Sequence, residues 1–558
     1  MPGKQPDNTR LRRNIGFQRF FSVSGLAFAV LFMAASLTPT LIPRTYVMQG
    51  ALSGASAAVG YGFGVFLRWL WLYLELPMPS GSRLRLINLV VAACCVLVLV
   101  VFLRHATEWQ NSVLEVMRQP PVTSTYPLRL CLIAAVVFLV LVVLGKCFGF
   151  VFRIVAVWTQ RFVPRRVANV VGVVVAAGLF WTVANGVVFR IVINMLDASF
   201  KQADALIEPD SVAPAATEKS GSAASLISWG ELGFRGRNFV SSGPAADRIR
   251  AFTGQGAMEP IRVYVGLPAG ETADDRARLA LDELKRVDAF SRAALVVITP
   301  TGTGFVDPAA IDTLEYLFHG NVASVAQQYS YLSSPLSLLI EPDYGADAAR
   351  ALFREVYAYW TTLPKDKRPK LYLHGLSLGA MNSERSLQLY EQLGDPINGA
   401  LFSGPPFESS LWRTLTDARN PGSTAWLPEF RDGSFARFMN QNGGTVPKDA
   451  PWGPLRIVYL QYASDPVVFF DYRDLYRPPA WLNYPRGPDV SSALRWSPIV
   501  FVLQLAIDTA VANGAPIGYG HVYAPQHYID AWLQVTGLDD WSTQDITRLK
   551  DHFAATAR

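Results

Sequence analysis

The chain has 558 residues, of which 51% are hydrophobic and only 17% are charged, and its formal net charge at pH 7 is +6. This length exceeds that of one ordinary domain, and the low charged fraction argues against a fully soluble protein. The basic residues cluster beside long uncharged runs near the N-terminus, so the positive charge requires no nucleic-acid partner.

Five apolar runs within residues 1–196 are long enough to cross a bilayer, so we expect a membrane domain there. They are Phe20–Ile42, Ala51–Leu74, Leu86–Leu103, Leu130–Phe150 and Val167–Phe189. Arg68 interrupts the second run, and Lys146 lies near the end of the fourth. The first run is a candidate for a cleaved signal peptide, but it is longer than a usual signal core and four more runs follow it. We therefore interpret it as an uncleaved anchor.

Lysine and arginine predict the orientation of these runs. Basic residues precede the first run, separate the second from the third at Arg83 and Arg85, and follow the fourth at Arg165 and Arg166. The positive-inside rule places these loops and the N-terminus in the cytoplasm. Five crossings would then place the rest of the chain outside the cytoplasm. We expect a multi-pass protein of the plasma (inner) membrane, with the lipid bilayer as its partner; nothing in the sequence indicates an oligomeric state.

Beyond the membrane domain, residues 197–228 are rich in Ala, Ser and Pro and are predicted to be a linker. Residues 229–558 alternate short apolar strand patterns with helical patterns, which predicts a mostly parallel sheet with helices on both faces. Two irregular stretches, 405–451 and 472–496, are interpreted as lid and pocket material. The apolar run Ile499–Ile507 is too short to cross a bilayer and is predicted to be a buried helix.

None of the four cysteines lies in residues 229–558, so we expect this domain to fold without disulfides. No spacing of Cys and His is typical of a metal site, and no motif indicates a cofactor. The glycines at 302 and 304 are not followed by the Gly-Lys-Ser/Thr of a phosphate-binding loop.

Residues 375–379 read Gly-Leu-Ser-Leu-Gly between an apolar strand pattern and a helical run. Strand, sharp turn and helix around G-x-S-x-G are typical of a nucleophile elbow, in which the serine hydroxyl stands clear of the sheet. The flanking glycines carry no Cβ to obstruct that turn. Because the pattern often arises by chance, the prediction that Ser377 is a nucleophile depends on a base and an acid elsewhere in the chain.

Elbow enzymes carry the acid and then the histidine after the serine. Asp465 directly follows a predicted strand, and His521 follows a glycine-rich turn before the last helices, so we predict that these two residues complete a triad with Ser377. His527 remains an alternative base. Asp471 and Asp474 remain alternative acids, although they lie farther from the strand end.

Hydrolysis through a tetrahedral intermediate requires backbone N–H donors for the oxyanion. The residue after the nucleophile, Leu378, is expected to supply one donor. Thr301 or Gly302, in the glycine-containing loop after the strand 294–299, is expected to supply the other.

Six segments together resemble bacterial membrane-anchored α/β-hydrolase-family proteins with an N-terminal multi-span region. They are IRVYVGL (261–267), TPTGTGFVDP (299–308), QQYSYL (327–332), GLSLGA (375–380), SGPP (403–406) and GHVYAP (520–525). The family commonly has an acidic residue before the nucleophile, where this chain has Leu376. The resemblance implies an α-helical transmembrane bundle followed by an α/β-hydrolase domain with serine-hydrolase chemistry, and implies little about substrate.

These observations favour a membrane-tethered serine hydrolase, of the esterase, lipase or thioesterase kind, acting on a lipid-like or acyl ester. Two alternatives remain open at this point. The same acyl-enzyme could pass its acyl group to an envelope acceptor. The domain could instead be a non-catalytic part of a membrane scaffold or transport protein.

Overall fold

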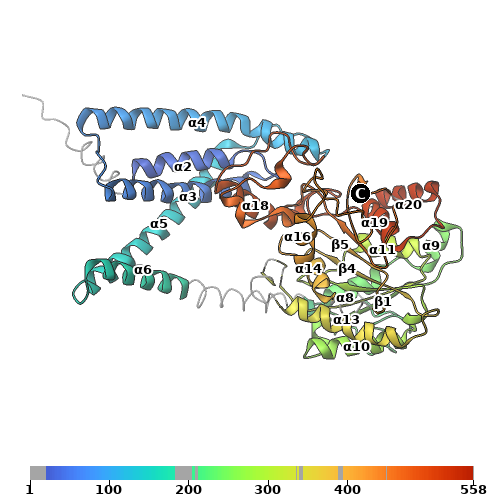
Figure 1. Ribbon diagram of the computed structural model, residues 1–558. Helices are drawn as coiled ribbons and strands as arrows, with labels where there is room; N and C mark the ends of the chain where they lie inside the picture. The colour runs from blue at the N-terminus through green and yellow to red at the C-terminus, as the bar shows by residue number, and fades with distance from the viewer. Residues whose placement is uncertain are drawn as a thin grey trace, which may run out of the picture. The chain divides into compact units, whose positions relative to one another are not determined.

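The computed structural model describes residues 21–182, 201, 204–207, 212–332, 334, 336–337, 343–387, 394–447 and 449–556. The chain divides into two compact units (Figure 1). The first comprises Met1–Arg190, Asp471–Pro479 and Val490–Val511. The second comprises Ile191–Phe470, Ala480–Asp489 and Ala512–Arg558.

The first unit is helical. Its N-terminal helices are α2 (Val23–Ser36), α3 (Tyr46–Tyr73), α4 (Gly81–Val116), α5 (Pro127–Thr159) and α6 (Arg165–Trp181). Glycines let α3 approach its neighbours closely: a Cβ at Gly60 would lie 2.5 Å from the Phe28 carbonyl oxygen of α2, and one at Gly54 would lie 2.5 Å from the Ala134 oxygen of α5. Such small-residue contacts are typical of helices that pack within a membrane.

Three helices of the described residues, α3, α4 and α5, are long and apolar enough to cross a membrane. The predicted first span, Phe20–Ile42, is too long, because α2 has 14 residues and ends at Ser36. At 1.5 Å per residue it extends about 21 Å, less than the ~30 Å of a bilayer core. Pro39 and Pro43 follow its end and cannot continue a helix. The predicted fifth span extends past Trp181, outside the described residues.

A helix far along the chain completes this unit. α18 (Val500–Ala510) packs against α2 and α3, and the Gln504 amide donates hydrogen bonds to the carbonyl oxygens of Ser36 (3.3 Å) and Thr38 (3.1 Å), where α2 ends. Asp508 accepts from Arg44 Nε at 2.7 Å. The predicted buried helix is therefore present. However, much of the stretch predicted as lid and pocket material, 472–479 and 490–496, belongs to the helical unit.

The second unit contains an eight-stranded sheet in the order β1-β3-β2-β4-β5-β8-β6-β7, in which every pairing is parallel except β6 with β7. The strands are β1 (Ile261–Val265), β2 (Ala294–Thr299), β3 (Val322–Gln327), β4 (Lys370–Leu376), β5 (Gly399–Ser403), β6 (Ala436–Asn440), β7 (Gly443–Gly444) and β8 (Arg456–Leu460). Strands β1, β2, β3 and β5 are buried along their whole length, as expected for a parallel sheet covered on both faces.

The helices of this unit form two groups (Figure 1). One group packs together as α10 (Ala273–Arg286), α13 (Tyr344–Thr362) and α14 (Leu378–Ser386), and the other as α11 (Pro308–Leu317), α19 (Pro525–Thr536) and α20 (Thr543–Thr556). Other α-helices among the described residues of this unit are α8 (Gly233–Ser242), α9 (Ala246–Thr253), α16 (Ser410–Asp417) and α17 (Pro466–Phe469). This is the mostly parallel α/β architecture predicted from the alternating pattern.

The end of the predicted linker, 197–228, is packed rather than free. The buried carboxylate of Glu283 on α10 accepts hydrogen bonds from the hydroxyls of Ser220 (3.0 Å) and Ser225 (2.7 Å) and from the amide of Leu226 (3.0 Å). These contacts attach residues 220–226 to the second unit, so the compact domain begins before residue 229.

Candidate active site

Ser377 occupies a strained turn between β4 and α14. Its backbone has φ 59° and ψ −126°, in a region that residues with a side chain rarely adopt. Neither elbow glycine leaves room for a side chain. A Cβ at Gly375 would lie 2.3 Å from the carbonyl carbon of Gly379, and one at Gly379 would lie 2.2 Å from the Thr299 oxygen. The sequence therefore forms the elbow geometry that G-x-S-x-G predicts.

Asp465 and His521 are hydrogen-bonded to each other. The His521 Nδ1 lies 2.7 Å from Asp465 Oδ2, and both side chains are buried. Asp465 follows β8, and its Oδ1 also accepts the amide of Val467 (2.9 Å) at the start of α17. An ionised carboxylate can only accept, so Nδ1 carries the proton and Nε2 is the basic nitrogen. Within the described part of the chain, that buried Nε2 has no hydrogen-bond partner.

Ser377 and His521 each contact one of two consecutive residues at the end of β5, Ser403 and Gly404. The Ser377 amide donates to the Ser403 carbonyl oxygen at 2.9 Å. The next residue, Gly404, has φ +51°, and a Cβ there would lie 2.7 Å from His521 Cε1. No hydrogen bond joins the hydroxyl of Ser377 to Nε2. The predicted nucleophile and base thus lie against one short segment, without a direct hydrogen bond.

Tyr523 is a second hydrogen-bond partner of Asp465 Oδ2. Its buried hydroxyl donates to Asp465 Oδ2 at 2.7 Å, the oxygen that also accepts from His521. This role was missed in the sequence, because GHVYAP places the tyrosine two residues after the histidine without indicating its partner.

A second set of hydrogen bonds joins the loop that carries Asp465 to the loop that carries His521. The hydroxyl of Ser464 donates to the buried Asp489 carboxylate (2.6 Å) and accepts from the amide of Gly520 (2.9 Å). Ser464 precedes Asp465 and Gly520 precedes His521, so this bridge fixes the separation of the two loops. Asp489 lies in an irregular stretch, and no sequence signal pairs it with Ser464.

Asp307 is a further buried carboxyl in this region. Burial raises its pKa to about 6, against the opposing effects of a hydrogen bond from Tyr528, the amide of Ala309 and the charge of His521. The Tyr528 hydroxyl lies 2.9 Å from Asp307 Oδ2. This aspartate belongs to the segment 299–308, and sequence reasoning gave it no role.

The alternative residues have other partners. His527 Nδ1 lies 2.6 Å from the hydroxyl of Tyr462, and burial lowers the pKa of His527 to about 4. Asp471 accepts the amide of Arg473 (2.8 Å), and it belongs to the first unit together with Asp474. These contacts favour His521 and Asp465 over the alternatives.

The predicted oxyanion donors differ in whether their amides already donate a hydrogen bond within the protein. Leu378 is the first residue of α14, where amides point out of the helix. The Thr301 amide donates to the Phe305 oxygen (3.0 Å), and the Gly302 amide donates to the hydroxyl of Ser334 (3.2 Å). Either of these two would have to exchange its present bond to receive an oxyanion, so their role stays a prediction. Among the described residues no group of three or more His, Cys, Asp or Glu is placed to hold a metal ion.

Comparison with known proteins gives the family. A model of the alpha/beta-hydrolase family matches residues 261–549, and a model of the N-terminal region of that family matches residues 37–244. No curated protein and no solved structure matches the chain. The first match covers more than half of the 558 residues and includes the elbow and both loops of the site. The chain therefore belongs to the α/β-hydrolase family.

Proposed function

We propose that the protein is a membrane-tethered serine hydrolase that cleaves an ester of a lipid-like acyl group. The observation that carries this proposal is the Asp465–His521 hydrogen bond, which leaves Nε2 unpartnered beside the segment that also holds the Ser377 turn. A base with its proton on Nδ1 and its other nitrogen unoccupied is what activation of a serine hydroxyl requires.

In this proposal His521 Nε2 takes the proton of Ser377 as the oxygen attacks the ester carbonyl carbon. The negative charge that develops on the carbonyl oxygen is received by the amide of Leu378 and a second donor. The carbon–oxygen bond then breaks, and the alcohol leaves with the proton from Nε2. Water attacks the acyl-enzyme, gives its proton to His521, and releases the acid while Ser377 regains its hydrogen.

The membrane part of the proposal is supported by three apolar helices with the length of a span. A lipid-like substrate follows from that setting, because a tethered enzyme meets substrates that partition into the bilayer. We further propose that the catalytic domain lies outside the cytoplasm, as the basic loops indicate. Reporter fusions after residue 212 and after residue 556 test this placement: both should be active only with a periplasmic reporter.

The hydrolase proposal is tested by labelling the purified full chain with a fluorophosphonate probe. Wild type and Ser410→Ala, which changes an exposed serine, should label, and Ser377→Ala should not. His521→Gln should lose labelling while His527→Gln keeps it. Equal labelling of wild type and Ser377→Ala, or none of either, would end the proposal. Release of acid from p-nitrophenyl esters of increasing chain length then gives the acyl preference.

A further inference from the structure

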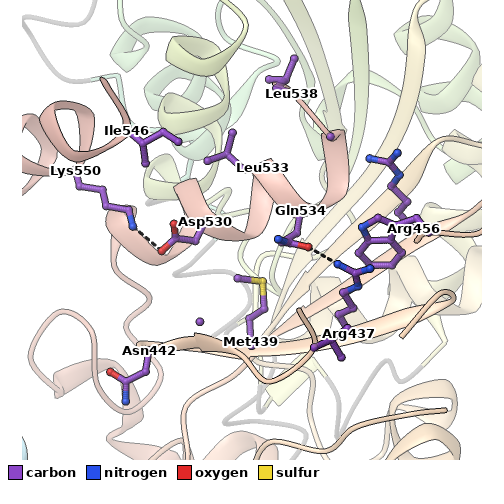
Figure 2. A pocket seen from close by; sticks show the side chains of 15 residues that line it. Arg437, Met439, Asn442, Arg456, Asp530, Leu533, Gln534, Leu538, Ile546 and Lys550 are labelled. Carbon is purple, nitrogen blue, oxygen red and sulfur yellow. Dashed lines mark hydrogen bonds and ion pairs between the residues drawn. The ribbon is translucent and has the colours of Figure 1, made fainter. Parts of the chain in front are cut away.

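A cavity lies in the second unit, and the residues of the candidate active site do not line it. It has a volume of about 540 Å³, within the range of small-molecule sites. Residues of β6, β7 and β8 form one side, and residues of α19 and α20 form the other (Figure 2). Ser377, Asp465 and His521 are not among the residues that line it.

Arg437 on β6 forms part of the cavity wall and is only 3% exposed. Its N–H groups donate to the carbonyl oxygens of Gly433 (3.0 Å) and Ala450 (2.5 Å) and to the side-chain oxygen of Gln534 (2.7 Å). The guanidinium also lies over Trp452, 3.9 Å from the ring centre. All these partners are neutral. In the described chain no carboxylate forms an ion pair with this buried charge.

A second guanidinium lies close by. Figure 2 shows Arg456 beside Arg437 at one end of the cavity, with Lys550 and Asp530 at the other end. Burial and the charge of Arg456 both lower the pKa of Arg437. Arg456 lies against Gly537 at the C-terminus of α19, where a cation interacts favourably with the helix dipole. That contact explains the position of Arg456 but supplies no full negative charge.

The charges around the cavity do not balance. Lys550 is already paired with Asp530 at 2.7 Å, whereas neither arginine forms an ion pair among the described residues. The charge of Asp432 partly opposes that of Arg456 at Arg437, but Asp432 does not line the cavity. Like charges in a partly buried site are unfavourable unless an anion lies near them. Met439, Leu533 and Ile546 add apolar side chains to the lining.

We propose that this cavity binds an amphipathic oxyanion. Its carboxylate or phosphate group would lie against Arg437 and Arg456, because guanidinium groups match the planar geometry of oxyanions. Its short apolar chain would lie along Met439, Leu533 and Ile546, where the flexible methionine adapts to chains of different shape. This site does not depend on the chemistry of Ser377.

Binding of hexanoate to the full chain, measured by saturation-transfer NMR, tests the proposal, with hexan-1-ol and inorganic phosphate as probes that carry only the chain or only the charge. Hexanoate should bind saturably and more tightly than either. Arg456→Gln and Ile546→Trp, which change opposite walls, should each weaken hexanoate binding by about tenfold or more. The control Arg350→Gln changes an exposed arginine of α13 and should not.

The same titration separates this site from the candidate active site. Ser377→Ala should bind hexanoate as wild type does, even if the proposed hydrolase function is wrong. The proposal is overturned if wild type shows no saturable binding, if hexan-1-ol binds as tightly as hexanoate, or if both wall variants retain wild-type affinity. Loss of binding in Ser377→Ala with retention in Arg456→Gln would also overturn it, because the ligand would then occupy the active site.

Discussion

The buried ion pair between Arg44 and Asp508 gives the sharpest test of how the first unit is assembled. The two side chains are 3% and 0% exposed, and Arg44 Nε lies 2.7 Å from Asp508 Oδ1. Asp508 Oδ2 also accepts the amide of Leu41 at 3.1 Å, and the hydroxyl of Thr40 forms a further hydrogen bond to this carboxylate. Burial raises the pKa of Asp508, and the charge of Arg44 opposes that rise.

Removal of the Arg44 cation alone should therefore greatly lower the stability of the first unit. Arg44→Met leaves a buried carboxylate with little compensation, and the expected loss of stability is about 3–5 kcal/mol. In a unit of this size that corresponds to a fall in Tm of roughly 6–20 °C. The loss should be smaller at pH 5 than at pH 8. Without Arg44 the pKa of Asp508 rises still further above its unfolded value, so the protonated form is stable at low pH and the penalty grows as pH rises.

The double variant separates the ion pair from simple loss of packing. Arg44→Met with Asp508→Leu replaces both charges by apolar groups of similar size, and it should lie within about 1–2 kcal/mol of wild type. Thermal unfolding of the full chain in detergent micelles, followed by tryptophan fluorescence, measures all four members of the cycle. As a control, the exposed pair Asp282 and Lys285, 60% and 38% exposed, should change stability by less than about 1 kcal/mol on the same replacement. A double variant as unstable as the sum of the two single variants would refute the coupling.

Three further outcomes are expected from the second unit. Burial raises the pKa of Glu384 on the elbow helix to about 7; because this exceeds the unfolded value, the stability of wild type relative to Glu384→Gln should fall by about 2.5 kcal/mol between pH 5 and pH 8 in urea unfolding. Gly375→Ala forces a Cβ to 2.3 Å from the Gly379 backbone, so fluorophosphonate labelling should fall more than tenfold, whereas unchanged labelling would contradict the elbow packing. Tyr523→Phe removes one of the bonds to Asp465, so kcat for ester hydrolysis should fall by about tenfold with KM unchanged; an effect on KM alone would speak against a positioning role.

The local part of the site could be predicted from the sequence because its signals are local. The strained turn at Ser377 is indicated in the sequence by Gly375 and Gly379, two residues before and after it, where the backbone leaves no room for a Cβ. Asp465 and His521 each follow a recognisable strand or turn, and parallel strands bring such ends to one edge of the sheet. The sheet was predicted for the same reason, except for β6 (Ala436–Asn440) and β7 (Gly443–Gly444), which lie inside a stretch that carries no clear strand period.

Contacts between distant residues could not be predicted in this way. Gln504 and Ser36, which are joined by a hydrogen bond, are 468 positions apart. The run Ile499–Ile507 predicts an apolar helix but does not indicate which helices it packs against. Asp489 likewise carries no local mark of its bond to Ser464. The length of α2 is a different case, because Pro39 and Pro43 already indicate in the sequence that a helix cannot continue to Ile42.

The path of the chain between Asp465 and His521 passes through both units. After Asp465 the chain enters the first unit at residues 471–479, returns to the second unit for 480–489, and enters the first again at 490–511 before it reaches His521. The short return supplies Asp489, which holds the two loops together through Ser464. On the stretch that follows, Phe501 and Leu505 are buried within the helical unit. Removal of the N-terminal helices would therefore expose an apolar face of α18 and release both ends of the segment that carries Asp489.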